Sequence, residues 1–315
     1  MKTVLVAGAA GFIGSHLCDK LLKEGFRVIA IDNFISGKPK NLFHLKNNEN
    51  FKFVEQDLTD SIQISEDIDL ILHFASPASP VDYLKYPVET LKVNSIGTIN
   101  LLNLSREKNS RYLLASTSET YGDPFVHPQT ENYWGNVNPV GLRSVYDEGK
   151  RFSEAISMAY YRTYNLDVRI IRIFNTYGPR MKVQDGRVVP NFIFQALKGE
   201  DLTVYGDGSQ TRSFCYIDDL IRGIYEVALS ENIEGEIFNL GCPEEYKIID
   251  FAKIIIEKIN SNSKISYKTL PVDDPKRRCP DISKIKEFLG WEPKITLDEG
   301  ITKTIEFFKS NLIVD

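Results

Sequence analysis

Cysteine and histidine are scarce in this sequence of 315 residues, and long apolar runs are missing. The four cysteines are widely separated and none belongs to a Cys-x-x-Cys pair, so we expect reduced thiols, as in the cytoplasm. The four histidines lack the spacing of metal ligands, and no protein-bound catalytic metal is predicted. No run of about 18 apolar residues occurs, so no membrane-spanning helix is predicted either.

A strong positive charge is also absent. The formal net charge is -5 at pH 7, which argues against nucleic acid as a partner. No signal peptide is expected, because Met1–Thr3 lead directly into the short apolar segment Val4–Ala7. The composition, with 42% hydrophobic and 26% charged residues, is ordinary for a globular protein, and we expect that protein to be cytoplasmic.

Three glycines near the start are regularly spaced. Gly8, Gly11 and Gly14 follow the apolar segment 3–7 and begin a helical pattern. Glycines in such a turn let backbone N–H groups approach a pyrophosphate at the positive end of the helix. The spacing is G-x-x-G-x-x-G, and its place between a strand and a helix favours a dinucleotide-binding loop over a merely tight turn.

An acidic residue ends the second strand pattern. Residues 27–31 lead into Asp32, at the place where a dinucleotide-binding fold carries an acid. A carboxylate there accepts hydrogen bonds from the adenine ribose and repels a 2′-phosphate, so NAD is predicted rather than NADP. Lys38 and Lys40 follow, but they lie later in the loop than an expected phosphate-binding arginine.

Four more strand patterns alternate with helical patterns, at residues 51–54, 69–74, 111–115 and 167–174. Strands that alternate with helices form parallel sheets, so an α/β fold with a doubly wound parallel sheet of the Rossmann type is predicted. Beyond residue 178 the alternation fades into short strands, turns and helices. We therefore predict a smaller, mixed α/β C-terminal lobe.

Tyr146 and Lys150 lie four residues apart in a helical pattern that we expect Ser144 to cap. The spacing places both side chains on one side of the helix. A lysine ammonium beside a phenol favours the phenolate, so the pair can move the proton of a sugar hydroxyl. The strand pattern 111–115 ends in the polar cluster Ser116–Glu119, which we expect to lie at the same site.

With the glycine loop and the Tyr146/Lys150 pair, the chain resembles the extended short-chain dehydrogenases/reductases that act on nucleotide sugars. Finer motifs resemble those of UDP-glucuronate decarboxylases (UDP-xylose synthases) over nearly the whole chain. These motifs are Ser76–Pro80, Ser116–Glu119, Tyr133–Pro139, Tyr146–Arg151, Ile173–Arg180, Asp185–Val189, Leu202–Arg212 and Asp273–Arg277. The sequence departs from the family at Leu142, where proline is usual, and in the ribose loop at Phe34–Gly37.

The resemblance implies an NAD-dependent decarboxylation of UDP-glucuronate to UDP-xylose. Tyr146, assisted by Lys150 and Thr117, would remove the proton of the C4 hydroxyl while C4 is oxidised. The 4-keto sugar would lose CO2, C5 would be protonated and C4 reduced again, so that NAD is regenerated. Glu119 would orient the ring or a water near C5, and Ser118 would accommodate a substrate carboxylate that an aspartate would repel.

The resemblance also implies ligand contacts. The NAD contacts would be Gly8, Gly11, Phe12, Ile13, Gly14, Asp32, Asn33, Ser36, Gly37, Asp57, Leu58, Ala75, Ser76, Asn94, Ser116, Tyr146 and Lys150. The UDP-sugar contacts would be Pro77, Tyr83, Asn175, Arg180, Val189, Asn191, Thr203, Tyr205, Gln210, Arg212 and Arg278. Arg212 would meet either the diphosphate or the carboxylate, since arginine suits both anions.

The resemblance also implies two domains with different ligands, and a homodimer. Residues 1–178 would bind NAD and carry the catalytic pair, and residues 179–315 would bind the nucleotide sugar. The apolar faces of the helical patterns at 87–107 and 144–164 suit a helical bundle between two copies, although the same faces could belong to the core.

Three alternative functions share most of these features. A nucleotide-sugar 4,6-dehydratase typically has aspartate where this chain has Ser118, because a leaving C6 hydroxyl needs an acid. A 4-epimerase needs the same tyrosine and lysine but has no use for Glu119. An inactive NAD-binding regulatory protein would have no reason to keep the catalytic residues intact. A released 4-keto-pentose, in place of UDP-xylose, is also left open as the product.

Overall fold

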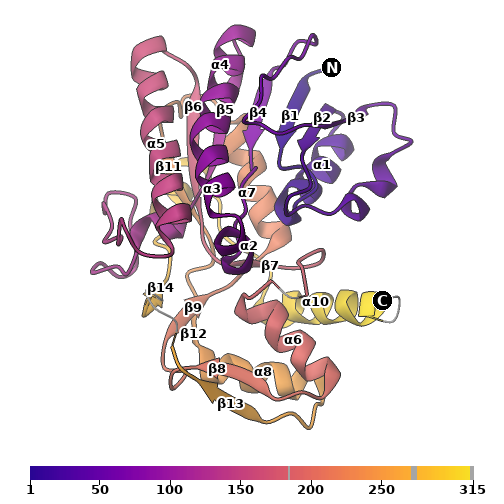
Figure 1. Cartoon of the computed structure of the whole chain (residues 1–315), viewed down its shortest axis with the longest axis vertical. Helices are drawn as coiled ribbons and strands as arrows, with labels where there is room; N and C mark the ends of the chain where they lie inside the picture. The colour runs from indigo at the N-terminus through magenta and orange to yellow at the C-terminus, as the bar shows by residue number, and fades with distance from the viewer. Residues whose placement is uncertain (184, 271–274, 313–315) are drawn as a thin grey trace.

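The computed structural model describes residues 1–183, 185–270 and 275–312, and its centre is a parallel sheet of seven strands (Figure 1). The strands run in the order β11-β6-β5-β4-β1-β2-β3, and every neighbouring pair is parallel. Their bounds are β1 (Thr3–Ala7), β2 (Arg27–Asp32), β3 (Phe51–Glu55), β4 (Leu70–His73), β5 (Arg111–Thr117), β6 (Val168–Ile173) and β11 (Ile237–Leu240). The predicted fold class is thus confirmed.

Helices cover both faces of this sheet. They are α1 (Phe12–Lys23) and α7 (Ile217–Leu229) on one face, and α3 (Pro87–Lys92), the π-helical η3 (Val93–Gly97), α4 (Thr98–Lys108) and α5 (Ser144–Tyr164) on the other. Val4 and Val6 of β1 pack toward α1 and α7, whereas Leu5 and Ala7 pack toward α4. Successive strand residues point to opposite faces, so strands buried on both sides must be apolar throughout, as the sequence pattern indicated.

The C-terminal part of the chain builds a second lobe below the sheet in Figure 1. Its elements are α6 (Val188–Lys198), β8 (Leu202–Tyr205), β9 (Thr211–Ser213), β12 (Glu245–Lys247), α8 (Ile248–Ile259), β13 (Ile265–Lys268), β14 (Arg277–Arg278) and α10 (Leu297–Leu312). The helix α9 (Ser283–Leu289) instead packs against β11 of the central sheet. Of the resembling motif at 273–277, Asp273 and Asp274 lie outside the described residues. Short connecting elements are η1 (Pro39–Asn41), η2 (Phe43–Leu45), α2 (Pro80–Lys85), η4 (Ser118–Tyr121), β7 (Thr176–Tyr177) and β10 (Cys215–Tyr216).

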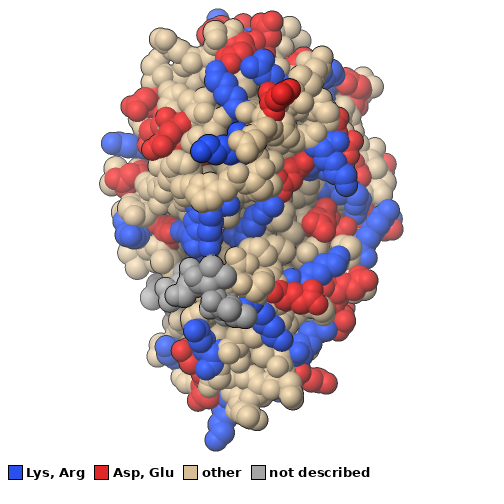
Figure 2. All heavy atoms as spheres, turned by 90° about the vertical axis from the view of Figure 1, so that its right-hand side faces the viewer, with Lys and Arg blue, Asp and Glu red and all other residues tan. Residues whose placement is uncertain are grey.

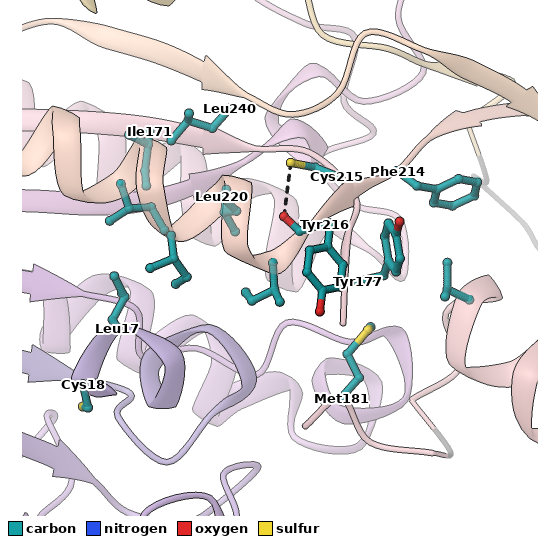
Figure 3. Packing of buried hydrophobic residues seen from close by; sticks show 14 of the residues in the cluster. Leu17, Cys18, Ile171, Tyr177, Met181, Phe214, Cys215, Tyr216, Leu220 and Leu240 are labelled. Atoms are coloured by element: carbon teal, nitrogen blue, oxygen red, sulfur yellow. Dashed lines mark hydrogen bonds between the residues drawn. The ribbon is translucent and has the colours of Figure 1, made fainter. Parts of the chain in front are cut away.

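The two lobes share one core. Figure 3 shows Leu17 of α1 and Leu220 of α7 in the same cluster as Tyr177 and Tyr216, whose strands β7 and β10 pair with each other. Both α7 and β11 come from beyond residue 178 and yet belong to the large sheet layer. The central sheet therefore crosses the predicted boundary, and the division of roles between residues 1–178 and 179–315 stays a prediction.

The start of α5 differs from the prediction. Ser144 does not cap α5, because Arg143 already has helical backbone angles and its carbonyl accepts the N–H groups of Tyr146 and Asp147.

The packing of α5 was predicted in part. The helical pattern predicts packing by Ala155, Ile156, Ala159 and Tyr160. Ile156 and Tyr160 pack against the core, but Ala155 is exposed, and the polar Ser153, Glu154 and Ser157 are buried. The reason is that α5 packs on η3 through polar contacts, among them a 2.6 Å bond from the Ser153 hydroxyl to the Asn94 carbonyl. Helical periodicity cannot anticipate a buried face that is polar.

The surface carries charges of both signs. Figure 2 shows basic and acidic side chains interspersed over one face of the molecule. In the described part of the chain, no helix is long and apolar enough to cross a membrane. The described residues also contain no group of three or more His, Cys, Asp or Glu side chains that could hold a metal ion.

Candidate active site

A cavity of about 660 Å³ lies at the carboxyl ends of the central strands. Its walls come from the loops after β1, β4, β5 and β6 and, on the other side, from α6, β8 and β9 of the second lobe. Ligands of open α/β sheets bind at this edge, where the strand order reverses. The cavity therefore joins the predicted cofactor and substrate regions.

The glycine loop after β1 forms one end of the cavity. Gly8 has a φ of +81°, and a Cβ atom there would lie 2.6 Å from the Ala75 nitrogen. A Cβ atom on Gly14 would overlap the Gly8 carbonyl oxygen. Gly11 precedes α1 without any side-chain cap, which leaves the first N–H groups of the helix for a ligand. This cradle fits the pyrophosphate of a dinucleotide.

Asp32 supports the same loop. Its carboxylate accepts hydrogen bonds from the Ala10 nitrogen at 2.9 Å and from the Phe34 nitrogen at 2.8 Å. Burial raises the pKa of Asp32, and these backbone bonds partly oppose the rise. A Cβ atom on Gly37 would lie 2.9 Å from the carboxylate, so the glycine keeps the space beside Asp32 open. An acid at this place fits the ribose of NAD.

Tyr146 and Lys150 project from α5 into the middle of the cavity. The Tyr146 ring stacks on Tyr83 with centroids 5.3 Å apart, and Lys150 donates to the Ala115 carbonyl at 2.8 Å. Burial raises the pKa of the Tyr146 phenol, and the hydrogen bond with Thr117 opposes this. Burial likewise lowers the pKa of Lys150 to about 7. A cation bound beside the phenol would shift Tyr146 toward the phenolate that the proposed chemistry needs.

Glu119 is held by arginines. Arg143 donates to one carboxylate oxygen at 2.6 Å, and Arg278 pairs with the other. Burial would raise the pKa of Glu119, but Arg278, Arg143 and Arg212 together lower it to about 2. Glu119 is therefore a carboxylate at neutral pH and not a proton-donating acid. Ser118 lies beside it, is 3% exposed and carries no charge.

Most of the predicted residues line this cavity. They are Gly8, Gly11, Phe12, Ile13, Gly14, Ser36, Ser76, Tyr83, Ser116, Thr117, Ser118, Glu119, Tyr146, Lys150, Asn175, Arg180, Val189, Asn191, Thr203, Tyr205, Gln210 and Arg212. The lining does not include Asp32, Asn33, Gly37, Asp57, Leu58, Ala75, Pro77, Asn94 and Arg278.

Several of the second group stand directly behind the wall. Asn33 donates to Asp57 at 2.7 Å, and Asn94 donates to the Ser76 hydroxyl at 3.0 Å. Arg278, expected to touch the substrate, is 2% exposed and lies behind Glu119, where it also donates to the Gly122 carbonyl at 2.9 Å. The structure thus places Arg278 as a partner of Glu119.

Several charged residues of the lining were not among the predicted site residues. Arg143 is one, and four others form two ion pairs: Lys182 with Asp82 at 2.8 Å, and Arg187 with Asp185. Arg143 had a local signal, because it lies three residues before Tyr146 at the start of α5, and Asp185 and Arg187 belong to the resembling motif Asp185–Val189. Arg180 lines the cavity too and donates to Asp19 of α1 at 2.6 Å.

A dinucleotide loop and a Tyr/Lys pair on one Rossmann-type sheet define an extended short-chain dehydrogenase/reductase, and the cofactor of this class is NAD. The family model described as GDP-mannose 4,6 dehydratase matches residues 5–304. UDP-glucuronic acid decarboxylase 1 of Xenopus tropicalis is 50% identical over 311 residues, which cover 99% of this chain and 73% of that protein. The chain belongs to the family of UDP-glucuronic acid decarboxylases.

Solved structures agree with this class. UDP-glucose 4-epimerase of Thermotoga maritima, solved with UDP-glucose, has a TM-score of 0.91 and 32% identity, with 98% of this chain and 99% of that chain covered. UDP-glucuronic acid 4-epimerase of Bacillus cereus, in complex with UDP-glucuronic acid and NAD, has a TM-score of 0.88 and 29% identity, with the same coverage of 98% and 99%.

Proposed function

We propose that this protein decarboxylates UDP-glucuronate to UDP-xylose with NAD as a regenerated cofactor. The observation that carries the proposal is the pair of residues after β5: Ser118 is neutral, and Glu119 is an ion-paired carboxylate. Neither can protonate a leaving hydroxyl, which a 4,6-dehydratase requires. A neutral Ser118 and the surrounding arginines instead suit a substrate that carries its own carboxylate.

The chemistry follows from the side chains of the cavity. NAD, held by the glycine loop and Asp32, would supply the hydride acceptor for the oxidation of C4 and the hydride donor for its final reduction. Tyr146 removes the proton of the C4 hydroxyl and gives it back at the end, while Lys150 stabilises the phenolate. Thr117, in hydrogen-bond contact with Tyr146, holds the C4 oxygen. A ketone at C4 lies β to the carboxylate, so CO2 leaves with its electrons delocalised as an enolate.

The arginines around Glu119 stabilise the negative charges of Glu119 and of the substrate. Arg143 and Arg278 keep Glu119 ionised and fixed, which lets it orient the ring or a water that protonates C5. Arg212 lines the cavity and binds the diphosphate or the carboxylate of the substrate. In this proposal residues 1–178 bind NAD and residues 179–315 bind the nucleotide sugar.

A homodimer in the cytoplasm completes the proposal. On α3, η3 and α5, the apolar side chains Val88, Leu91, Ile96 and Phe152 are exposed. Exposed apolar side chains on adjacent helices support pairing with a second copy through a helical bundle. The four free cysteines of the described residues, three of them buried, support a reducing compartment.

The proposal is tested by incubating the protein with UDP-glucuronate and NAD+ and following the products by NMR. We expect CO2 and UDP-xylose, and the spectrum separates UDP-xylose from a free 4-keto-pentose. UDP-galacturonate would instead identify a 4-epimerase. Loss of water from a UDP- or dTDP-hexose, without turnover of UDP-glucuronate, would identify a dehydratase and refute the proposal.

A further inference from the structure

Behind the catalytic pair lies a buried polar network on the faces of α5, β5 and β6. The Ser116 hydroxyl donates to Oε1 of Glu154 at 2.5 Å. Arg172 of β6 grips the same carboxylate with two bonds, 2.9 Å to Oε1 and 2.7 Å to Oε2. Glu154 and Arg172 are each only 9% exposed. Both oxygens of Glu154 therefore have partners, and the carboxylate is fixed in one orientation.

The network continues away from the cavity and locks Arg172. Its second terminal nitrogen donates to the Tyr121 hydroxyl at 3.0 Å, and that hydroxyl donates to Asn239 of β11 at 2.8 Å. The Arg172 guanidinium also lies over the Tyr121 ring, 4.8 Å from its centroid. Such a network holds its members more rigidly than separate pairs would.

The bond to Glu154 determines what Ser116 can do. A serine hydroxyl has one proton, and Ser116 gives that proton to the carboxylate. Ser116 also lines the cavity. Its oxygen can therefore only accept hydrogen bonds there, from an N–H or O–H group of a bound ligand.

Glu154 also acts on Lys150. The two residues lie one helical turn apart on α5, the spacing at which side chains meet. Lys150 is 3% exposed, so its ammonium has little water around it. Burial lowers its pKa, and Glu154 is the charged group that opposes this effect.

The other titratable groups around Lys150 do not take this role. Tyr146 on α5 is neutral when protonated, and His73 on β4 is fully buried, which keeps its pKa well below the ordinary value and its ring neutral. Arg172 on β6 is occupied by Glu154. Among the described residues near Lys150, Glu154 supplies the negative charge.

We propose that Glu154 is a positioning residue of the active site, which keeps Lys150 as an ammonium and fixes the Ser116 hydroxyl as an acceptor toward the cavity. The role of Lys150 in this inference rests on the proposed function. Glu154 touches no substrate, since it is absent from the cavity lining. This role explains why α5 buries the carboxylate of Glu154.

The test measures Lys150 directly in the ligand-free protein. Lysine side chains labelled with ¹³C and ¹⁵N are followed by NMR from pH 5 to 10, and the Lys150 signal is assigned by its loss in Lys150→Arg. In the unsubstituted protein we expect a midpoint near pH 7. In Glu154→Gln, which keeps the shape but not the charge, we expect the midpoint to fall by about one pH unit or more.

Two further variants keep the test decisive. Tyr121→Phe removes a hydroxyl from the same network without touching the charge of Glu154, so its Lys150 midpoint should stay unchanged. If Glu154→Gln fails to fold because Arg172 is left unpaired, the double variant Glu154→Gln/Arg172→Gln removes both charges. It should show a smaller shift in the same direction, because Glu154 is the charged group that acts on Lys150 and the loss of the Arg172 cation offsets only part of its removal.

An unchanged midpoint in a folded Glu154→Gln or double variant overturns the inference, as does an equal shift in Tyr121→Phe. Turnover of UDP-glucuronate is measured in parallel. If the unsubstituted protein shows none, the proposed function fails, but the Lys150 titration still decides the role of Glu154. The two failures are therefore distinguishable.

Discussion

Replacement of Ser118 by aspartate is the sharpest test of how the cavity recognises its substrate. Ser118 is 3% exposed, so water would screen a new carboxylate there poorly. Arg143 and Arg278 already form ion pairs with Glu119 and would not neutralise the added charge. Two unit charges about 5 Å apart repel by roughly 3 kcal/mol at an effective dielectric of about 20. A repulsion of that size corresponds to a loss of about 100-fold, which Arg212 would reduce toward about tenfold.

The matched control is Ser118→Asn, which has nearly the shape of aspartate but no charge. We expect kcat/KM for UDP-glucuronate to fall about 10- to 100-fold further in Ser118→Asp than in Ser118→Asn. Burial raises the pKa of such a carboxyl, so the difference should grow as the pH rises and the aspartate ionises. Calorimetry adds a second comparison, because the aspartate should weaken binding of UDP-glucuronate but not of UDP-xylose, which has no carboxylate. Equal losses in the two variants, or for the two ligands, would refute the placement of Ser118 beside the carboxylate.

Three further substitutions test other parts of the site. Tyr146→Phe should keep NAD affinity, measured by calorimetry, and lower kcat about 100- to 10,000-fold, and full activity would remove Tyr146 from the mechanism. Gly14→Ala should abolish NAD binding, because its Cβ atom would overlap the Gly8 carbonyl, and unchanged affinity would contradict the geometry of the loop. Arg143→Met should cost about 3 kcal/mol in urea unfolding at pH 7 by leaving Glu119 half-paired. The folded pKa of Glu119, about 2, lies below the ordinary value of about 4.3, so its contribution to stability is present above pH 4.3 and vanishes as the pH falls through 2. The difference between Arg143→Met and the unsubstituted protein should therefore shrink in acid, and a difference independent of pH would show that the bond to Glu119 is not its cause.

Local patterns predicted the parts of the site that one segment builds. The glycine loop, Asp32 and the Tyr146/Lys150 pair each depend on a strand or helix and the few residues beside it, so their spacing in the sequence is enough to indicate them. Six strands of the sheet followed from the same alternation of apolar strands and helices, whereas β11 comes from beyond residue 178, where that alternation fades.

Contacts between distant segments could not be predicted in this way. Nothing near Glu119 in the sequence indicates that Arg278 would reach it from β14. The burial of Glu154 on α5 was not predicted for a related reason, since Arg172 of β6 stabilises its carboxylate there. Hydrophobic periodicity does not predict the burial of a charged residue whose ion-pair partner comes from a distant segment of the chain.

The path of the chain between the two lobes has a consequence for engineering. A fragment of residues 1–178 would end before β11 and α7, leaving the edge of β6 open and the apolar residues around Leu17 uncovered. Exposed strand edges and apolar faces promote aggregation, so we expect such a fragment to aggregate when it is expressed without the rest of the chain. Grafting a different sugar-binding lobe onto this scaffold would have to retain residues 217–240 as part of the cofactor half. The cofactor half and the sugar-binding half have separate roles in the proposed reaction, but neither is built from one continuous segment of the chain.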